Sequence, residues 1–301
     1  MFFVIIGLIG GLALFLYGMR ITSEGLKNTF GNKLKQILST LSKNKLIALS
    51  TGIILTFTIQ SSTAASTLLV SLVNTGIMSL SQTLSILLGT SLGTTVAAQI
   101  IAFRISDYAF LIIVVGFGLM ILGRKRKQRF IGNILLGIGF IFLGMKVMSD
   151  SVAPLKDHAL FKETLTNLEH IPLLALLAGM LFTSLIQSST ATMGLIISLA
   201  IQGLIPLNLA IPIILGSRLG SCSTVLFAGI GATRSAKRVA WANLLFKLTG
   251  VIIFFILTPL LILLLQRTST SLARQIANAH AIISISEVLI FLPFTEVFAR
   301  F

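Results

Sequence analysis

Charged residues are scarce in this sequence, and long stretches contain none at all. Only 10% of the 301 residues are charged, whereas an average soluble protein has about 25%. Residues 46–103 and 171–217 carry no charge, and each run is longer than the roughly 20 residues that one bilayer crossing requires. With a mean hydropathy of +1.02, the composition excludes an ordinary soluble domain. It predicts a multi-pass membrane protein that is helical wherever lipid meets the backbone.

Cysteine is also nearly absent. Cys222 is the single cysteine, so an internal disulfide is excluded, and the sequence has no Cys–His cluster typical of a metal site. The apolar N-terminal segment MFFVIIGLIGGLALFLYGM lacks both a basic start and a small-residue cleavage site. We therefore expect a retained first helix rather than a signal peptide, and no cofactor.

The charges that are present are mostly basic, with a net charge of +15. They lie in short loops beside apolar segments, such as RKRKQR at 124–129. This distribution follows the positive-inside rule for loops on the cytoplasmic side of a membrane. It indicates a lipid bilayer, and not a nucleic acid, as the partner of the basic residues.

Three pairs of motifs indicate an internal repeat. QSST occurs at 60–63 and 187–190, and GTSLGTT at 89–95 is followed 127 residues later by GSRLGSC at 216–222. Upstream, LFLYGM at 14–19 matches IFLGM at 141–145. This order and spacing predict a tandem duplication. The predicted parts are a first repeat (1–123), a basic cytoplasmic loop (124–129), a second repeat (130–266) and an extra transmembrane helix (267–301).

The hydropathy pattern predicts how these parts cross the membrane. Full crossings are expected at about 3–20, 80–103, 108–123, 130–149, 207–230, 239–266 and 279–298. Segments 46–74 and 173–203 are too short for two crossings each, so we expect re-entrant helical hairpins with QSST at the middle. Residues 26–43 are expected to form a basic amphipathic helix on the membrane surface.

The number of crossings sets the orientation of the repeats. Three crossings per repeat give the two repeats opposite orientations, and this arrangement leaves most basic residues in the cytoplasm. The predicted fold is an all-α polytopic membrane protein with two inverted-topology repeats, each containing a re-entrant hairpin and a Gly-rich, broken helix. Inverted repeats with broken helices are typical of secondary transporters.

The polar motifs are the candidate substrate- and ion-binding site. Serine, threonine and glutamine are common where membrane helices pack, but repetition at matched positions favours a site on the axis between the repeats. Helix termini with hydroxyl and amide groups can hold anions and cations without fixed charges. The candidate residues are Gln60, Ser61, Ser62, Thr63, Thr90, Ser91, Thr94 and Thr95 in the first repeat, and Gln187, Ser188, Ser189, Thr190, Ser217, Arg218 and Ser221 in the second.

The doubled QSST, the Gly-rich stretches, ATRSAKRVAWANLLFKLTGV (232–251) and QIANAHAIISI (275–285) resemble the type II sodium–phosphate cotransporter family over nearly the whole chain. The resemblance implies sodium-coupled symport of inorganic phosphate by alternating access, not an enzyme. It implies a multi-pass protein of a bacterial cytoplasmic (inner) membrane, here without the PhoU-like C-terminal domain of many bacterial relatives. A monomer and a homodimer remain open. Both QSST motifs would line the substrate and sodium sites, with sodium at Gln60, Ser61, Ser62, Gln187, Ser188 and Ser189.

The chain departs from the usual family pattern at several positions. Ser91 and Arg218 stand where the family usually has asparagine in its Gly-rich stretches, and Lys247 replaces the asparagine that usually follows Phe246. Proton coupling, another oxyanion and an anion channel therefore remain alternatives. An intramembrane hydrolase is disfavoured, because no histidine stands near a candidate nucleophilic serine.

Arg218 is a functional candidate because an intramembrane arginine is costly, and its guanidinium suits phosphate. The alternative is that Arg218 reaches the membrane interface or pairs with Glu287. Lys247 could extend to the interface, and a structural role is expected for it. Glu287 could neutralise either cation or belong to the ion path, and the sequence leaves these roles open.

Overall fold

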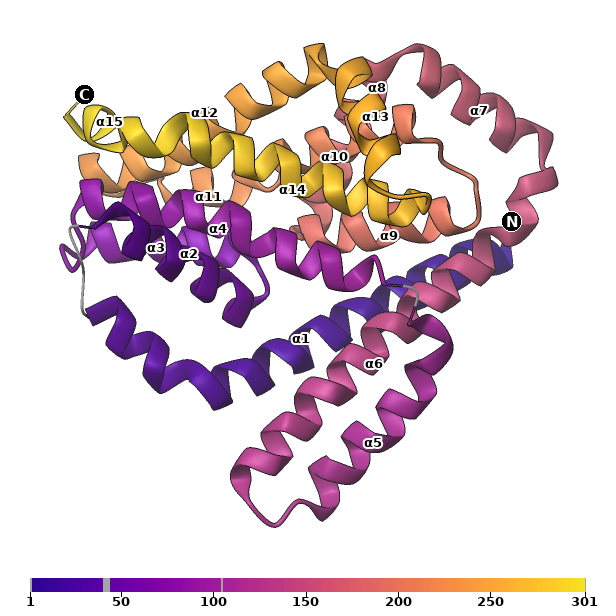
Figure 1. Ribbon diagram of the computed structural model, residues 1–301, viewed down its shortest axis with the longest axis horizontal. Coiled ribbons are helices and arrows are strands. Elements are labelled where there is room, and N and C mark those ends of the chain that lie inside the picture. Colours follow the sequence, from indigo (N-terminus) through magenta and orange to yellow (C-terminus); the bar gives the residue numbers. More distant parts are fainter. Residues whose placement is uncertain (1, 40–43, 104, 301) are drawn as a thin grey trace.

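The computed structural model describes residues 2–39, 44–103 and 105–300, and every regular element in these ranges is a helix (Figure 1). This confirms the all-α prediction. The α-helices are α1 (Phe2–Ser39), α2 (Lys45–Ile59), α3 (Ser62–Asn74), α4 (Leu80–Ile101), α5 (Ala109–Leu122), α6 (Arg126–Val152), α7 (Ala159–His170), α8 (Pro172–Ile186), α9 (Ser189–Ile201), α10 (Leu207–Gly220), α11 (Cys222–Ala228), α12 (Arg234–Ile256), α13 (Thr258–Thr268), α14 (Leu272–Phe291) and α15 (Thr295–Arg300).

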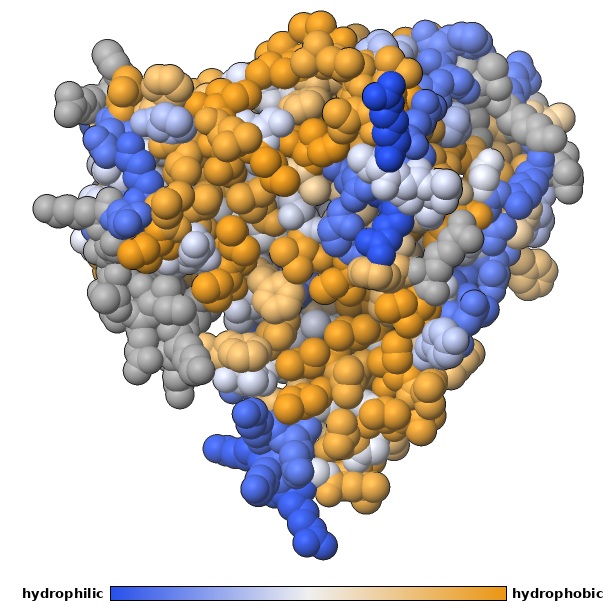
Figure 2. Space-filling model, viewed as in Figure 1, coloured by the Kyte–Doolittle hydropathy of each residue, from blue (hydrophilic) through white to orange (hydrophobic). Residues whose placement is uncertain are grey.

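Six segments of the described chain are long and apolar enough to cross a membrane, so the protein is a multi-pass membrane protein. They are Phe2–Gly31, Leu80–Ile101, Arg126–Lys156, Leu207–Ala228, Arg234–Ile256 and Leu272–Ala299. The crossing predicted at 108–123 is not among them, because its helix covers only Ser106–Leu122. In Figure 2 the visible surface is largely hydrophobic, and hydrophilic groups gather at its margins, including the end of the α5–α6 pair.

Three predicted helix boundaries were wrong. The surface helix expected at 26–43 is not separate, because α1 continues without a break to Ser39; residues 40–43 lie outside the described part. The helix expected at 239–266 divides at Leu257, just before Pro259. The last helix ends at Phe291, just before Pro293. Proline has no backbone N–H and is disfavoured inside a helix, which accounts for both divisions.

The two Gly-rich stretches behave differently, although both were expected to break their helices. In GSRLGSC the boundary between α10 and α11 lies at Ser221, but the interruption is slight, because Ser221 keeps helical backbone angles and its N–H donates to the carbonyl of Ser217. GTSLGTT lies inside the unbroken helix α4. There the hydroxyls of Thr90, Thr94 and Thr95 donate to carbonyls three residues earlier at 2.6–2.7 Å. These bonds satisfy the hydroxyls without interrupting the helix.

The glycines of both stretches bring two helix backbones together. Helix α2 packs along α4, and α8 packs along α10. A Cβ atom at Gly89 would lie 2.1 Å from the carbonyl oxygen of Leu49, and one at Gly216 would lie 1.8 Å from that of Leu176. Leu176 follows Leu49 by 127 residues, and Gly216 follows Gly89 by the same number. The packing therefore repeats at the spacing of the motifs, whereas the opposite orientation of the repeats stays a prediction.

Helix α14 packs against helices from both halves of the chain. It contacts α4, α9, α10 and α12, while α1 and α5 both pack along α6 at the side (Figure 1). Much of the buried core comes from α9, α10 and α14. Polar groups on α4, α10 and α12 that face α14 are therefore enclosed by protein on that side.

Candidate functional site

Each QSST segment forms the turn between two helices. Gln60 ends α2 and Gln187 ends α8, with φ angles of 58° and 57°. Ser61 and Ser188 cap the following helices, and each side chain accepts a hydrogen bond of 3.2 Å from a backbone N–H three residues later. In the described part of the chain, these glutamines are the only non-glycine residues with positive φ. Such conformations are strained and concentrate at functional sites.

The tips of the two turns meet at one open cavity of about 350 Å³. Gln60, Ser61 and Ser188 line it together with α1. The α1 side contributes Met19, Arg20, Ser23, Glu24 and Lys27, and Ile59 completes the lining. Ser23 also ties α1 to the first turn, since its hydroxyl donates to the carbonyl of Ile59 at 2.9 Å. Charged groups of α1 thus stand beside both turns, a contribution that the motif spacing did not indicate.

The remaining candidates lie behind these tips. Gln187 is exposed and does not line the cavity. Seven candidates are buried in helices near the turns: Ser62, Thr63, Ser189, Thr190, Thr90, Ser91 and Thr94. Thr95 is half-buried, and Ser217, Arg218 and Ser221 are buried. The structure therefore divides the candidates between an open cavity and an interior polar region.

Three charged side chains dominate that interior, and we call Arg218, Lys247 and Glu287 the buried charge cluster. Arg218 forms an ion pair with Glu287 and donates from Nη1 to Ser284 Oγ at 2.8 Å. Lys247 Nζ donates to Ser221 Oγ at 2.8 Å. Arg218 thus pairs with Glu287 and does not reach the interface. Lys247 is only 4% exposed, so it is enclosed by protein and does not extend to the interface.

Some polar residues of the site escaped the sequence analysis. Thr183 Oγ1 and Thr192 Oγ1 lie 2.7 Å apart and join α8 to α9. The 127-residue spacing pairs Thr183 with Thr56, whose buried hydroxyl has no hydrogen-bond partner among the described residues. Ala65 stands where the second repeat has Thr192. Applying the spacing to every polar residue, and not only to the motifs, would have found this pair.

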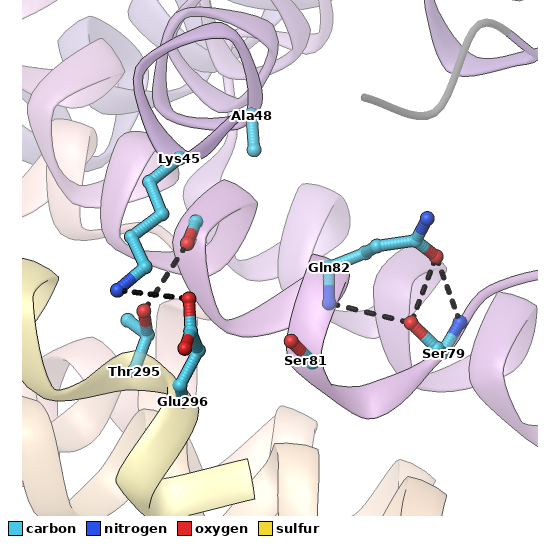
Figure 3. Close-up of a pocket in the computed structure, with 8 residues that line it drawn as sticks. Lys45, Ala48, Ser79, Ser81, Gln82, Thr295 and Glu296 are labelled. Atoms are coloured by element: carbon cyan, nitrogen blue, oxygen red, sulfur yellow. Dashed lines mark hydrogen bonds and ion pairs between the residues drawn. The ribbon is translucent and has the colours of Figure 1, made fainter. Parts of the chain in front are cut away.

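A second polar cavity, of about 270 Å³, lies where α2 and α4 begin, beside α15 (Figure 3). Lys45 Nζ lies 3.2 Å from Glu296 Oε1, and Ser85 Oγ donates to Thr295 Oγ1 at 3.5 Å. Ser79 and Gln82 cap α4 reciprocally on the opposite wall. Here Lys45 is already paired with Glu296, Ser79 with Gln82, and Ser85 with Thr295.

Comparison with known proteins gives the family. The family described as Na+/Pi-cotransporter matches residues 14–150 and again 143–291. YqeW of Bacillus subtilis is 28% identical over 95% of this chain and 93% of its own length. A protein of Escherichia coli named "Putative inorganic phosphate export protein YjbB" is 30% identical over 98% of this chain. This chain spans only 54% of that protein.

A human relative matches over a shorter stretch. "Sodium-dependent phosphate transport protein 2C" of Homo sapiens is 33% identical over 29% of this chain and 15% of its own length. No solved structure matches the chain. Because the family matches twice and together covers nearly all of the sequence, the chain belongs to the Na+/Pi-cotransporter family, a family of membrane transporters.

Proposed function

We propose that this protein carries inorganic phosphate across the cytoplasmic membrane together with sodium, by alternating access at the paired QSST turns. The observation that carries the proposal is that Ser61 and Ser188, which belong to matched and equally strained turns, line one cavity. Membership of the Na+/Pi-cotransporter family supports both transported ions. Energy comes from the sodium gradient, and no cofactor is needed.

The turns offer ligands for both ions. Helices α3 and α9 begin at Ser61 and Ser188, and the N-terminus of a helix favours an anion. Helices α2 and α8 end at the same turns, where carbonyl groups favour a cation. The two glutamine amides and the serine hydroxyls add donors and acceptors without a permanent charge. Such a site can release both ions once the protein opens to the other side.

The gradients set the direction of net transport. One positive charge that enters through a potential of 100 mV releases about 2.3 kcal/mol, and each tenfold sodium gradient adds about 1.4 kcal/mol per ion. Inward sodium gradients therefore drive phosphate uptake. The printed name of YjbB refers to export, so the opposite direction is part of the test.

The test is transport of radiolabelled phosphate by the purified protein in proteoliposomes. We expect saturable uptake with an inward sodium gradient and much less with potassium. Ser61→Ala and Ser188→Ala should each lower uptake at least tenfold, because each removes a hydroxyl at the cavity. Ser71→Ala is the matched control, since Ser71 lies on the exposed face of α3.

Each alternative gives a different result. Phosphate uptake driven by a proton gradient without sodium would show that the proposed coupling ion is wrong. Transport of sulfate or arsenate but not of phosphate would show that the proposed substrate is wrong. A flux that does not saturate would indicate an anion channel. Faster phosphate exit than entry under mirrored gradients would indicate an exporter.

A further inference from the structure

The buried charge cluster holds more positive than negative charge. Arg218, Lys247 and Glu287 are each at most 4% exposed, and all three lie in membrane-spanning segments. Two cations thus face one carboxylate. A buried charge without a counter-charge is costly, and charged groups inside a membrane usually mark a substrate or ion path. The excess of positive charge therefore favours binding of an anion at the cluster.

Several donors in the cluster lack acceptors. Arg218 uses Nη1 and Nη2, but its buried Nε has no partner in the described structure. Lys247 has three N–H donors, and the contact shown for its ammonium group within the described residues is the bond to Ser221. Unused donors are what an oxyanion, rich in acceptors, would satisfy.

Contacts link the first QSST hairpin to the cluster. Ser66, one turn into α3, lies 3.4 Å from Thr90 between the two hydroxyl oxygens. The next residue after Thr90 is Ser91, whose Oγ donates to Glu287 Oε1 at 3.5 Å. A short polar path therefore runs from the start of α3 to the carboxylate.

The second hairpin is linked to the cluster in the same way. Thr192 follows the Ser188 turn and contacts Thr183. Ser184, beside Thr183, donates to the carbonyl of Gly220 at 3.3 Å, and Gly220 precedes Ser221, the partner of Lys247. Residue contacts thus connect the cluster to both hairpins whose turns the proposed function assigns to phosphate.

We propose that Arg218 and Lys247 form a cationic binding site for the transported oxyanion, and that Glu287 occupies Arg218 while no anion is bound. This rests on the proposed function and adds two residues to its substrate site. Phosphate accepts bidentate hydrogen bonds from a guanidinium group, so it can replace the Glu287 carboxylate at Arg218. Lys247 then supplies the second positive charge. Binding exchanges one ion pair for another, and no covalent bond changes.

The test measures phosphate affinity and phosphate-dependent thermal stabilisation for the purified protein in nanodiscs at constant sodium. Lys247→Met keeps the length of the side chain but removes its charge, and should raise the phosphate Kd at least tenfold. Lys247→Arg restores the charge and should recover most of that loss. Glu287→Gln removes the competing carboxylate and should lower the phosphate Kd several-fold. In the absence of phosphate, this variant leaves Arg218 without its counter-charge, so the phosphate-free protein should be less stable.

The matched control is Lys146→Met. Lys146 is also on a membrane helix, but it pairs with Asp107 at the surface at 3.4 Å, so its loss should leave the phosphate Kd unchanged. A purely structural cluster would make Lys247→Met and Glu287→Gln shift the Kd in the same direction or not at all. Opposite shifts are the signature of the proposed exchange.

The outcomes separate this inference from the proposed function. If the wild type binds phosphate and Lys247→Met binds it equally well, the cationic site is wrong while the transporter stands. If Glu287→Gln weakens binding, Glu287 is a ligand and not a competitor. If that variant does not fold, the comparison of Lys247→Met with Lys247→Arg decides alone. A folded wild type that neither binds nor transports phosphate overturns the proposed function itself.

Discussion

Gln60 and Gln187 occupy a backbone conformation that suits glycine better. Gln60 gains a local bond, because its Nε2 donates to the carbonyl of Phe57 at 2.7 Å. One neutral hydrogen bond contributes about 1 kcal/mol, and the left-handed conformation costs about as much. The fold thus gains little from glutamine at this position. A functional role for the amide is the better reason for its presence in both turns.

Replacing Gln60 therefore separates stability from transport. We expect Gln60→Gly to be more stable than Gln60→Ala by about 1 kcal/mol, because alanine keeps the left-handed strain and glycine removes it. Both variants should lose phosphate uptake, since both lose the amide. Thermal unfolding in one detergent, together with uptake in proteoliposomes, checks this. Equal stability of the two variants would contradict the left-handed backbone conformation of Gln60.

At the scale of elements, glycine determines how closely α2 approaches α4 and α8 approaches α10. Small residues allow membrane helices to pack backbone against backbone. Gly179 and Gly220 border the same α8–α10 contact as Gly216, and in each case an added Cβ would lie within 2.3 Å of a backbone oxygen. Side chains cannot turn away from such a contact, so any substitution must separate the helices.

We predict that Gly216→Ala destabilises the protein by about 1–3 kcal/mol, which is the usual cost of overpacking. Gly250→Ala is the matched control within helix α12, because a Cβ there would have no atom within 4 Å. In a helix interior, alanine is favoured over glycine by up to about 1 kcal/mol, so this variant should be neutral or stabilised. Melting temperatures in the same detergent test the order. Two equal melting temperatures would show that α8 and α10 do not pack this closely.

Sequence patterns could predict the elements that a repeated spacing or a local signal defines. The 127-residue spacing placed both QSST segments at the middle of helix pairs, and the structure has the turns at Gln60 and Gln187. Pro259 and Pro293 also indicate the helix ends near them, because proline is disfavoured inside a helix. The spacing did not reveal that α4 remains unbroken, because hydrogen bonds to its own backbone satisfy the hydroxyls there.

The ion pair of the interior is the part that the sequence could not settle. Arg218 and Glu287 are 69 residues apart, and Glu287 lies on α14, in the segment predicted to lie outside both repeats. Spacing gives no partner for such a residue. Only the packing of α14 against α10 and α12 shows that Arg218, and not Lys247, forms the ion pair with the carboxylate of Glu287.

At the scale of the whole molecule, the contacts group the loops as the predicted topology requires. Lys45 pairs with Glu296, and Arg238 donates to the carbonyls of Phe298 and Ala299, so segments predicted to be cytoplasmic lie together. Gln99 bonds to Asn278 and Arg274 at the side predicted to be outside. These groupings fit inverted repeats.

Ser81 and Asn208 can assign the sides, because they occupy matched positions, 127 residues apart, at the exposed starts of α4 and α10. In a Cys222→Ser background, which removes the single native cysteine, Ser81→Cys should react with a membrane-impermeant maleimide only from the cytoplasmic side. Asn208→Cys should react only from outside, because the predicted topology places three crossings, at about 80–103, 108–123 and 130–149, between the two positions.

Lys125→Cys is the control for the cytoplasmic side. Lys125 is exposed and lies in the basic loop at 124–129, which the positive-inside rule places in the cytoplasm. Labelling of intact cells, compared with labelling of inverted vesicles, gives the result. If Ser81→Cys and Asn208→Cys react from the same side, the repeats are parallel. Two parallel repeats would present both QSST turns to one side of the membrane, and the alternating access proposed at their shared cavity would lose its structural basis.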